Sequence, residues 1–207
     1  MSAATRFGDT RSVPTPYEEL SNPAHVVFFS VVGAFAAGEL GQAFRLRRGA
    51  TRVDARAEAV LRLMVFGAVF LVPVGRAVAP GAVIGGGVWV FALGVVVACS
   101  GLLLRWWSFV TLGKYFTVVV RTTEDQPVVD RGPYRVLRHP SYTGLLLAFA
   151  GVGVMWGNWV SAVGAVGVVL IALIHRIRIE ERALNASLGD RYREFAANRA
   201  RLIPYIW

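Results

Sequence analysis

Cysteine is nearly absent from this sequence, since Cys99 is the only one in 207 residues. A single cysteine excludes a disulfide within the chain and a cluster of thiolate metal ligands. Histidine is also scarce: His25, His139 and His175 are far apart and lack the HExxH spacing of a metal-binding helix. The sequence therefore predicts no metal site.

Charged residues are few as well. They make up 17% of the chain, against about 25% in ordinary soluble domains, whereas 55% of the residues are hydrophobic. The formal net charge of +9 would suggest a nucleic-acid partner for a soluble protein. Here the basic residues lie between long apolar segments, where control of membrane topology and attraction to anionic lipid explain them. We therefore predict membrane lipids, and no nucleic acid, as partners.

The chain does have long apolar segments, and five of them are predicted to be transmembrane helices: 24–44, 59–79, 82–104, 142–155 and 160–174. The first three reach the roughly 20 residues that cross a hydrocarbon core of ~30 Å, and the last two are slightly short. The last two are separated by Trp156-Gly157-Asn158-Trp159, which combines turn-forming residues with aromatic residues typical of a membrane interface. The predicted fold is an all-α integral membrane protein of about five transmembrane helices, the last two forming a helical hairpin.

The basic residues gather in the stretches 45–56, 105–138 and 176–201, and the other connections carry few. Because basic loops tend to stay in the cytoplasm, this predicts an N-terminus outside and a cytoplasmic C-terminal helix with its loops. Residues 1–23 are polar, unlike a signal peptide, and are predicted to be an N-terminal surface tail. Residues 24–207 are predicted to form a single transmembrane domain.

One segment, GPYRVLRHPSYTG at 132–144, is polar, aromatic and basic, and it leads directly into an apolar helix. Pro140 suits the first turn of that helix, where a missing N–H group costs nothing. A basic membrane anchor would account for Arg138 and Pro140. It would not account for Tyr134, His139 and Tyr142 in the same short, proline-restrained segment, so a functional role is equally well supported.

A second polar segment, HRIRIEER at 175–182, follows the last apolar segment. Helical spacing places His175, Arg178 and Arg182 on one side and pairs Arg176 with Glu180. A solvated helix with weak surface ion pairs would produce the same pattern. Ionisable groups at a membrane boundary are, however, candidates for function.

Together these segments resemble the isoprenylcysteine carboxyl methyltransferase family of membrane enzymes. The resemblance covers residues 107–207 and rests on short motifs in a fairly specific order: LGKYFT at 112–117, the 132–144 segment, RIEE at 178–181, LGDRYREF at 188–195 and RLIP at 201–204. The cofactor-site motifs are thus expected within residues 112–207. Arg182, directly after the glutamate pair, departs from the family pattern.

The resemblance implies S-adenosylmethionine as methyl donor at the cytoplasmic face, S-adenosylhomocysteine as product, and a lipophilic acceptor that enters from the bilayer. The residues it implies for binding the cofactor are Tyr134, Arg138, His139, Pro140, Tyr142 and Glu180. Those it implies for catalysis are Arg178, Glu181 and Arg176.

The expected reaction is carboxyl O-methylation of a prenylcysteine-like acceptor or of an isoprenoid or polyketide acid. A carboxylate is already ionised near neutral pH, so it needs no general base, and Arg178 could hold it by two hydrogen bonds. A phenol, enol or thiol would need a base, for which His139 or a glutamate is the candidate. A lipidated cysteine, a small lipophilic molecule and a phospholipid amine all stay open as acceptors, and the oligomeric state is not predicted.

Two other classes of function are compatible with the sequence. An NADPH-dependent sterol or steroid reductase has a similar layout, although a pair of glutamates suits a cationic donor better than a polyanionic one. The second alternative is a noncatalytic membrane subunit or transporter. Against it, charges within the apolar segments are confined to Glu39 and to Arg62 and Arg76 near the ends of the second, so no conduction path is marked.

Overall fold

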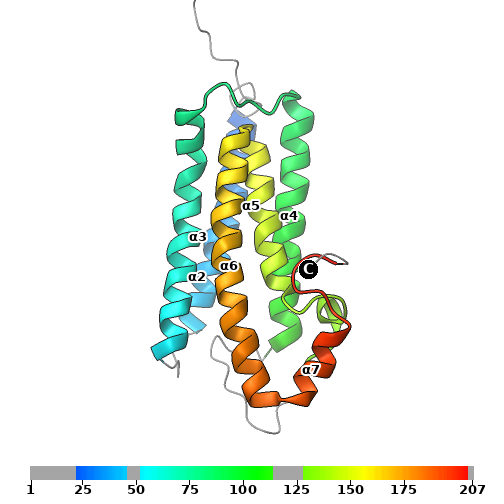
Figure 1. Ribbon diagram of the computed structural model, residues 1–207. Helices are drawn as coiled ribbons and strands as arrows, with labels where there is room; N and C mark the ends of the chain where they lie inside the picture. The colour runs from blue at the N-terminus through cyan, green and yellow to red at the C-terminus, as the bar shows by residue number, and fades with distance from the viewer. Residues whose placement is uncertain (1–21, 46–51, 114–127, 205–207) are drawn as a thin grey trace, which may run out of the picture.

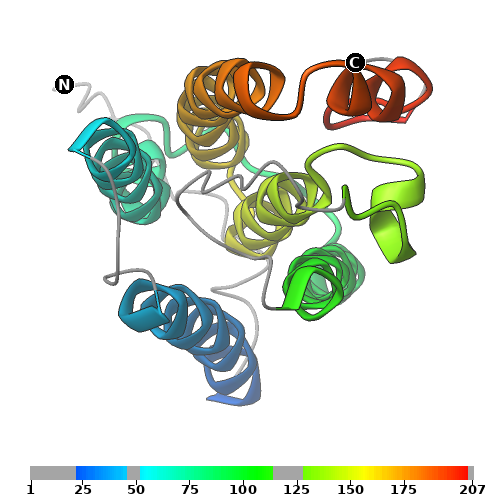
Figure 2. The same ribbon diagram turned by 90° about the horizontal axis from the view of Figure 1, so that it is seen from below.

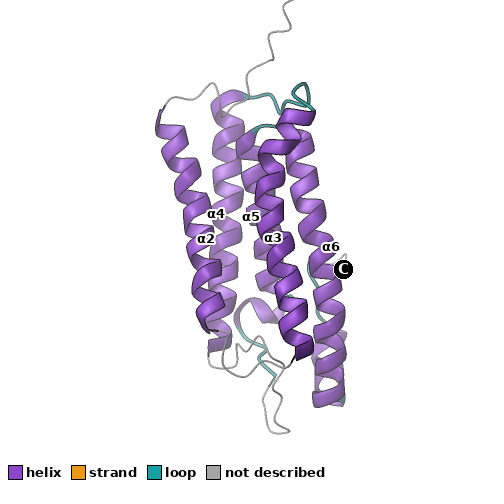
Figure 3. Cartoon of the chain, turned by 90° about the vertical axis from the view of Figure 1, so that its left-hand side faces the viewer, coloured by secondary structure: helices purple, strands orange, loops and turns teal. Residues whose placement is uncertain are grey.

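Five long helices run side by side in the computed structural model, which describes residues 22–45, 52–113 and 128–204 (Figure 1). They are α2 (Asn22–Arg45), α3 (Arg52–Val78), α4 (Gly87–Leu112), α5 (Pro140–Trp156) and α6 (Trp159–Leu188). The short helices η2 (Gly132–Arg135) and α7 (Asp190–Ala197) lie at one end of the bundle (Figure 1). The described residues form no β-strand (Figure 3), and the all-α prediction is confirmed.

Four of these helices, α2, α3, α4 and α6, are long and apolar enough to cross a membrane, and α5 is a shorter apolar helix of 17 residues. The chain is therefore a multi-pass integral membrane protein, while the count of five crossings and the orientation stay predictions. Of the predicted tail, residues 1–23, the first 21 lie outside the described residues, and the last two belong to α2.

The bounds of the third and the last predicted helix differ from the structure. The third apolar helix begins at Gly87 rather than at residue 82, because Gly86 and Gly87 adopt positive φ angles of 125° and 54° that no helix interior contains. It then continues past residue 104 to Leu112, so that Arg105 belongs to a helix and not to a loop. Likewise, α6 passes residue 174 unbroken and carries the charged segment 175–182 as part of the same helix.

The predicted helical hairpin is present, and its turn follows from its residues. Gly157 ends α5 in the left-handed conformation with φ 74°, which glycine adopts without strain. Asn158 begins α6 by accepting a hydrogen bond from the Ser161 N–H at 3.0 Å, and it donates to the Ala79 carbonyl at 2.8 Å. The turn is thereby attached to the end of α3.

Glycines let α4 and α5 approach backbone to backbone. A Cβ atom added at Gly144 would lie 2.5 Å from the Gly101 carbonyl oxygen, and one added at Gly151 would lie 2.6 Å from the Gly94 carbonyl oxygen. Small residues give this contact in lipid, where dispersion rather than the hydrophobic effect holds helices together. At these positions the absence of a side chain therefore permits the close approach of α4 and α5.

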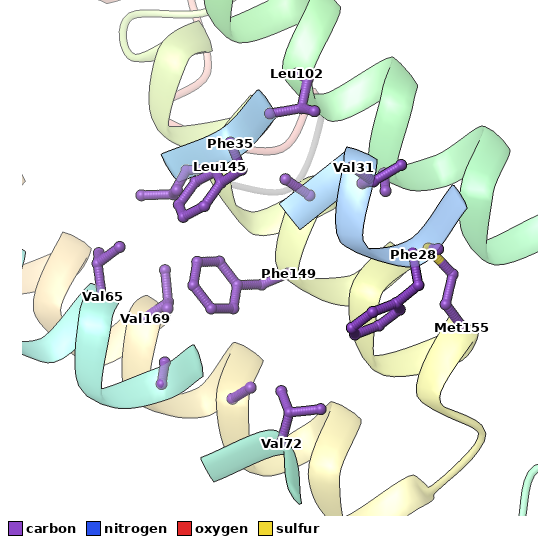
Figure 4. Packing of buried hydrophobic residues seen from close by; sticks show 14 of the residues in the cluster. Phe28, Val31, Phe35, Val65, Val72, Leu102, Leu145, Phe149, Met155 and Val169 are labelled. Carbon is purple, nitrogen blue, oxygen red and sulfur yellow. The ribbon is translucent and has the colours of Figure 1, made fainter. Parts of the chain in front are cut away.

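The helix α2 packs on the bundle through aromatic residues, as Figure 4 shows for Phe28, Phe35 and Phe149. Phe35 and Phe149 meet edge to face with ring centroids 5.4 Å apart. A ribbon view along the bundle shows α2 set apart from α3 (Figure 2). An apolar cavity of about 260 Å³ lies here, lined among others by Phe28, Phe35, Val72 and Phe149.

Candidate functional site

The two polar segments meet at the end of the bundle where α5 begins, and the chain's C-terminal segment joins them. Backbone N–H groups of Arg138 and His139 donate to the carbonyls of Ala200 and Arg201 at 2.8 and 3.1 Å. The Thr143 hydroxyl donates to the Leu202 carbonyl at 2.6 Å. Residues 199–202 therefore run alongside the start of α5 and hold it against α6.

Glu181 accepts hydrogen bonds from cations on two other segments. Arg138 Nη1 donates to its Oε1 at 3.0 Å, and Arg201 Nε donates to its Oε2 at 3.0 Å. His139 Nε2 lies 3.5 Å from Oε1. Only 9% of Glu181 is exposed, so these partners compensate a largely buried carboxylate.

Glu180 has its own set of partners. The Tyr142 hydroxyl donates to Oε2 at 2.9 Å, and Arg176 Nη2 donates to Oε1 at 3.2 Å. His139 Nδ1 lies 3.6 Å from Oε2, and the His139 and Tyr142 rings stack with centroids 5.5 Å apart and planes 11° apart. One imidazole thus lies between both carboxylates, with a nitrogen toward each.

Six of the predicted site residues are brought together in this cluster: Arg138, His139, Tyr142, Arg176, Glu180 and Glu181. Pro140 is buried at the first position of α5. Tyr134 is buried in η2, where its carbonyl accepts from Arg199 Nε at 2.9 Å. Burial, and then the charge of Glu180, raise the pKa of Tyr134 well above its ordinary value, so this phenol keeps its proton.

Arg178 is not in this cluster. The rotation of α6 leaves its side chain exposed, together with His175 and Arg182, while Arg176 is only 2% exposed. His175, Arg178 and Arg182 do lie on one side of the helix, as the spacing predicted. The side that faces the bundle is the one that carries Arg176. The buried arginine next to the glutamate pair is Arg176.

Three residues of the site were not predicted individually. Arg201 lies in the RLIP motif and pairs with Glu181, and Arg199 accepts at its carbonyl from Arg138 Nε at 2.8 Å. Tyr192 is 4% exposed, and its hydroxyl has no hydrogen-bond partner among the described residues. Burial, and then the charge of Glu181, raise its pKa well above the ordinary value. In the sequence, only the motifs that contain or adjoin these residues could have pointed to them. Residues 114–117 of the LGKYFT motif lie outside the described part of the chain.

The charges of the cluster suit a zwitterionic ligand. Arg138, Arg176 and Arg201 donate to two carboxylates, so guanidinium donors and carboxylate acceptors lie side by side, and either glutamate can also accept from an ammonium group. The unpartnered Tyr192 hydroxyl offers a further donor or acceptor. Among the described residues, no group of three histidine, cysteine or acidic side chains could hold a metal ion.

Comparison with known proteins gives relatives for this segment. Residues 92–186 match the model of the isoprenylcysteine carboxyl methyltransferase (ICMT) family. Protein-S-isoprenylcysteine O-methyltransferase A of Arabidopsis thaliana is 36% identical over 120 residues, which are 57% of this chain and 61% of that protein. Methanethiol S-methyltransferase of Mycobacterium tuberculosis is 40% identical over 73 residues, 35% of this chain and 28% of that protein. The matched segment thus spans less than two thirds of these relatives.

The fold also has a counterpart among solved structures. The structure of the eukaryotic intramembrane Ras methyltransferase ICMT superposes with a TM-score of 0.60 at 21% identity, covering 90% of this chain and 69% of that one. The likeness therefore extends over α2 and α3, beyond the segment that matches in sequence.

Proposed function

We propose that this chain, which is related to the isoprenylcysteine carboxyl methyltransferase family through residues 92–186, transfers a methyl group from S-adenosylmethionine to the carboxylate of a lipophilic acceptor. The observation that carries the proposal is the pair of neighbouring carboxylates at the end of an apolar helix bundle, the buried Glu181 held by Arg138 and Arg201 and the partly buried Glu180 held by Arg176. The related methyltransferases favour this function over a reductase or a noncatalytic subunit.

The residues present fit the cofactor's polar groups. Its ammonium would be taken by Glu180 or Glu181, and its carboxylate by one of the guanidinium groups of the cluster. Tyr134, His139 and Tyr142 supply flat surfaces for the adenine, and Pro140 fixes the backbone between the two rings of the stack. When bound, the cofactor supplies a methyl group on a positively charged sulfur.

The chain's contribution is to hold both reactants in line and to exclude water. The acceptor carboxylate needs no base, and a guanidinium would orient it by two parallel hydrogen bonds. Arg176 is the buried candidate for this guanidinium. It lies within the cluster, where it donates to Glu180 at 3.2 Å. The exposed Arg178 would reach an acceptor only from the outer face of α6.

The apolar part of the acceptor would lie in the cavity between α2, α3 and α5. Tyr142 of the site and Phe149 of the cavity are on the same helix, about 10 Å apart along its axis at the usual rise per residue. An isoprenoid chain attached to a carboxylate at the site would therefore extend into apolar surroundings. A small thiol would leave this cavity unfilled.

Calorimetric titration of the detergent-purified protein with S-adenosylhomocysteine, with NADPH in parallel, tests the cofactor. Binding of S-adenosylhomocysteine alone supports the proposal, binding of NADPH alone supports a reductase, and binding of neither supports a noncatalytic protein. Incubation with S-adenosylmethionine and either an S-farnesylcysteine derivative or methanethiol, followed by mass spectrometry, then tests the acceptor. Methylation of the thiol alone would contradict the carboxylate assignment and require a base such as His139.

A further inference from the structure

The helix α2 lies outside the matched residues 92–186, yet one of its side chains is tied to the site by an ion pair. Glu39 Oε1 accepts from Arg105 Nε of α4 at 2.6 Å, and the two side chains are 15% and 9% exposed. The helices approach closely here, because a Cβ atom at Gly38 would lie 3.0 Å from Trp106 Nε1. Glu39 of α2 is therefore held at a defined position against α4.

Arg105 uses its other end to hold the start of α5. Its Nη1 donates to the Ser141 carbonyl at 2.9 Å, and Ser141 lies between Pro140 and Tyr142. The backbone of α5 also approaches Arg105 directly, since a Cβ atom at Gly144 would lie 2.8 Å from the Arg105 nitrogen. The guanidinium thus connects α2 to the helical turn that carries Tyr142.

The geometry of this connection depends on the charge of Glu39. A guanidinium is planar and presents its donors in fixed directions, so holding Nε on Glu39 aims Nη1 at Ser141. Without the carboxylate, a guanidinium that is largely buried would lose its compensating charge and turn toward another acceptor or toward water. The first turn of α5, with Tyr142 stacked on His139, would then lose one of its fixed points.

We propose that Glu39 is a positioning residue for the reaction, acting through Arg105 on the first turn of α5. The inference rests on the proposed methyltransferase function. It assigns to α2 a part in the alignment of His139 and Tyr142 with Glu180, in addition to its contacts with the apolar core.

The test compares purified wild-type protein with Glu39→Gln, Glu39→Asp and the control Asp190→Asn, an exposed acid whose ion pair with Arg193 is on the surface of α7. We expect Glu39→Gln to lower both kcat and the affinity for S-adenosylhomocysteine by about 10- to 100-fold, as small misplacements of reacting groups do. The KM for the acceptor should stay within about two-fold, since its apolar contacts are unchanged. Glu39→Asp should recover most of the loss, and Asp190→Asn should match the wild type.

A double-mutant cycle with Arg105→Lys shows whether Glu39 acts through Arg105. We expect the second substitution to add little to the first, because each breaks the same connection. Wild-type activity in Glu39→Gln, equal losses in Glu39→Gln and Glu39→Asp, or fully additive losses in the cycle would each overturn this inference alone. Failure of the wild type to bind S-adenosylhomocysteine would instead overturn the proposed function, and this inference with it. Should Glu39→Gln not stay monodisperse, Arg105→Lys decides the outcome: wild-type kcat and wild-type affinity for S-adenosylhomocysteine in that variant would overturn the inference.

Discussion

Arg176 and Arg178 are two positions apart in α6, and the structure gives them different surroundings. Arg176 is buried and donates to Glu180, whereas Arg178 is exposed. The two arginines thus form a natural pair for asking which one serves the reaction, because substitutions at both affect the same helix and the same residue type.

Replacing each arginine with lysine keeps the charge and removes the planar fork. We expect Arg176→Lys to lower kcat/KM for methyl transfer by about 10-fold, the equivalent of roughly 1.4 kcal/mol, and Arg178→Lys to change it less than about three-fold. Initial rates on monodisperse protein measure both. A larger loss in Arg178→Lys would support the assignment made from the sequence motif instead.

Tyr142, which is partly buried, and the buried Tyr192 allow a similar comparison for cofactor binding. Tyr142→Phe keeps the stack on His139 and removes the 2.9 Å hydrogen bond to Glu180, so the affinity for S-adenosylhomocysteine should fall by about five-fold, or ~1 kcal/mol. Tyr192→Phe removes a hydroxyl without a partner among the described residues, so the thermal midpoint without ligand should not fall. Calorimetry on Tyr192→Phe then tells whether that hydroxyl contacts the cofactor: an unchanged affinity would argue that it does not.

At the scale of helices, the contact between α4 and α5 decides how the site is held. Both helices have glycine where their backbones meet, so the start of α5 is fixed by close packing as well as by its hydrogen bonds to residues 200 and 201. Other glycines, such as Gly164 of α6, have no neighbouring atom where a Cβ would stand. A methyl group added to glycine would therefore clash at the contact between α4 and α5 and would meet no atom at Gly164.

Gly151→Ala should destabilise the protein by about 1–3 kcal/mol, because the new methyl group would lie 2.6 Å from the Gly94 carbonyl oxygen and force α4 and α5 apart. Gly164→Ala should be neutral or stabilising by up to ~1 kcal/mol, since alanine favours a helix more than glycine does. Thermal unfolding in one detergent compares them. Equal midpoints for the two variants would contradict the close approach of α4 and α5.

For the whole molecule, the distribution of basic residues predicts the orientation in the membrane. The loop between α3 and α4 carries little charge, whereas the end of α6 and the C-terminal segment are rich in arginine. The site at that end would then face the cytoplasm, where S-adenosylmethionine is available, and the opposite loops would face outward.

Single cysteines introduced into a Cys99→Ala background test this orientation. A membrane-impermeant thiol reagent applied to intact cells should label Gly81→Cys in the loop between α3 and α4. It should label Ser187→Cys, at the exposed end of α6, only after the cells are permeabilised. The reverse pattern would place the site outside and would be incompatible with an intracellular methyl donor.

The sequence by itself determined the features that depend on local order along the chain. Long apolar segments dictate membrane helices, Gly157 and Asn158 dictate the turn between α5 and α6, and Pro140 sets the start of α5. The polar segments at 132–144 and 175–182 also identified most of the cluster, because each contains several of its residues in a row.

Only the tertiary structure decided which side of each charged helix faces the bundle and which distant residues complete the site. A helix can turn about its own axis without changing its sequence pattern, so spacing alone could not tell the stripe of Arg178 from that of Arg176. The pairs Arg201–Glu181 and Glu39–Arg105 join residues that lie far apart along the chain. Such contacts depend on how the helices pack and on where the C-terminal segment returns, which no local pattern encodes.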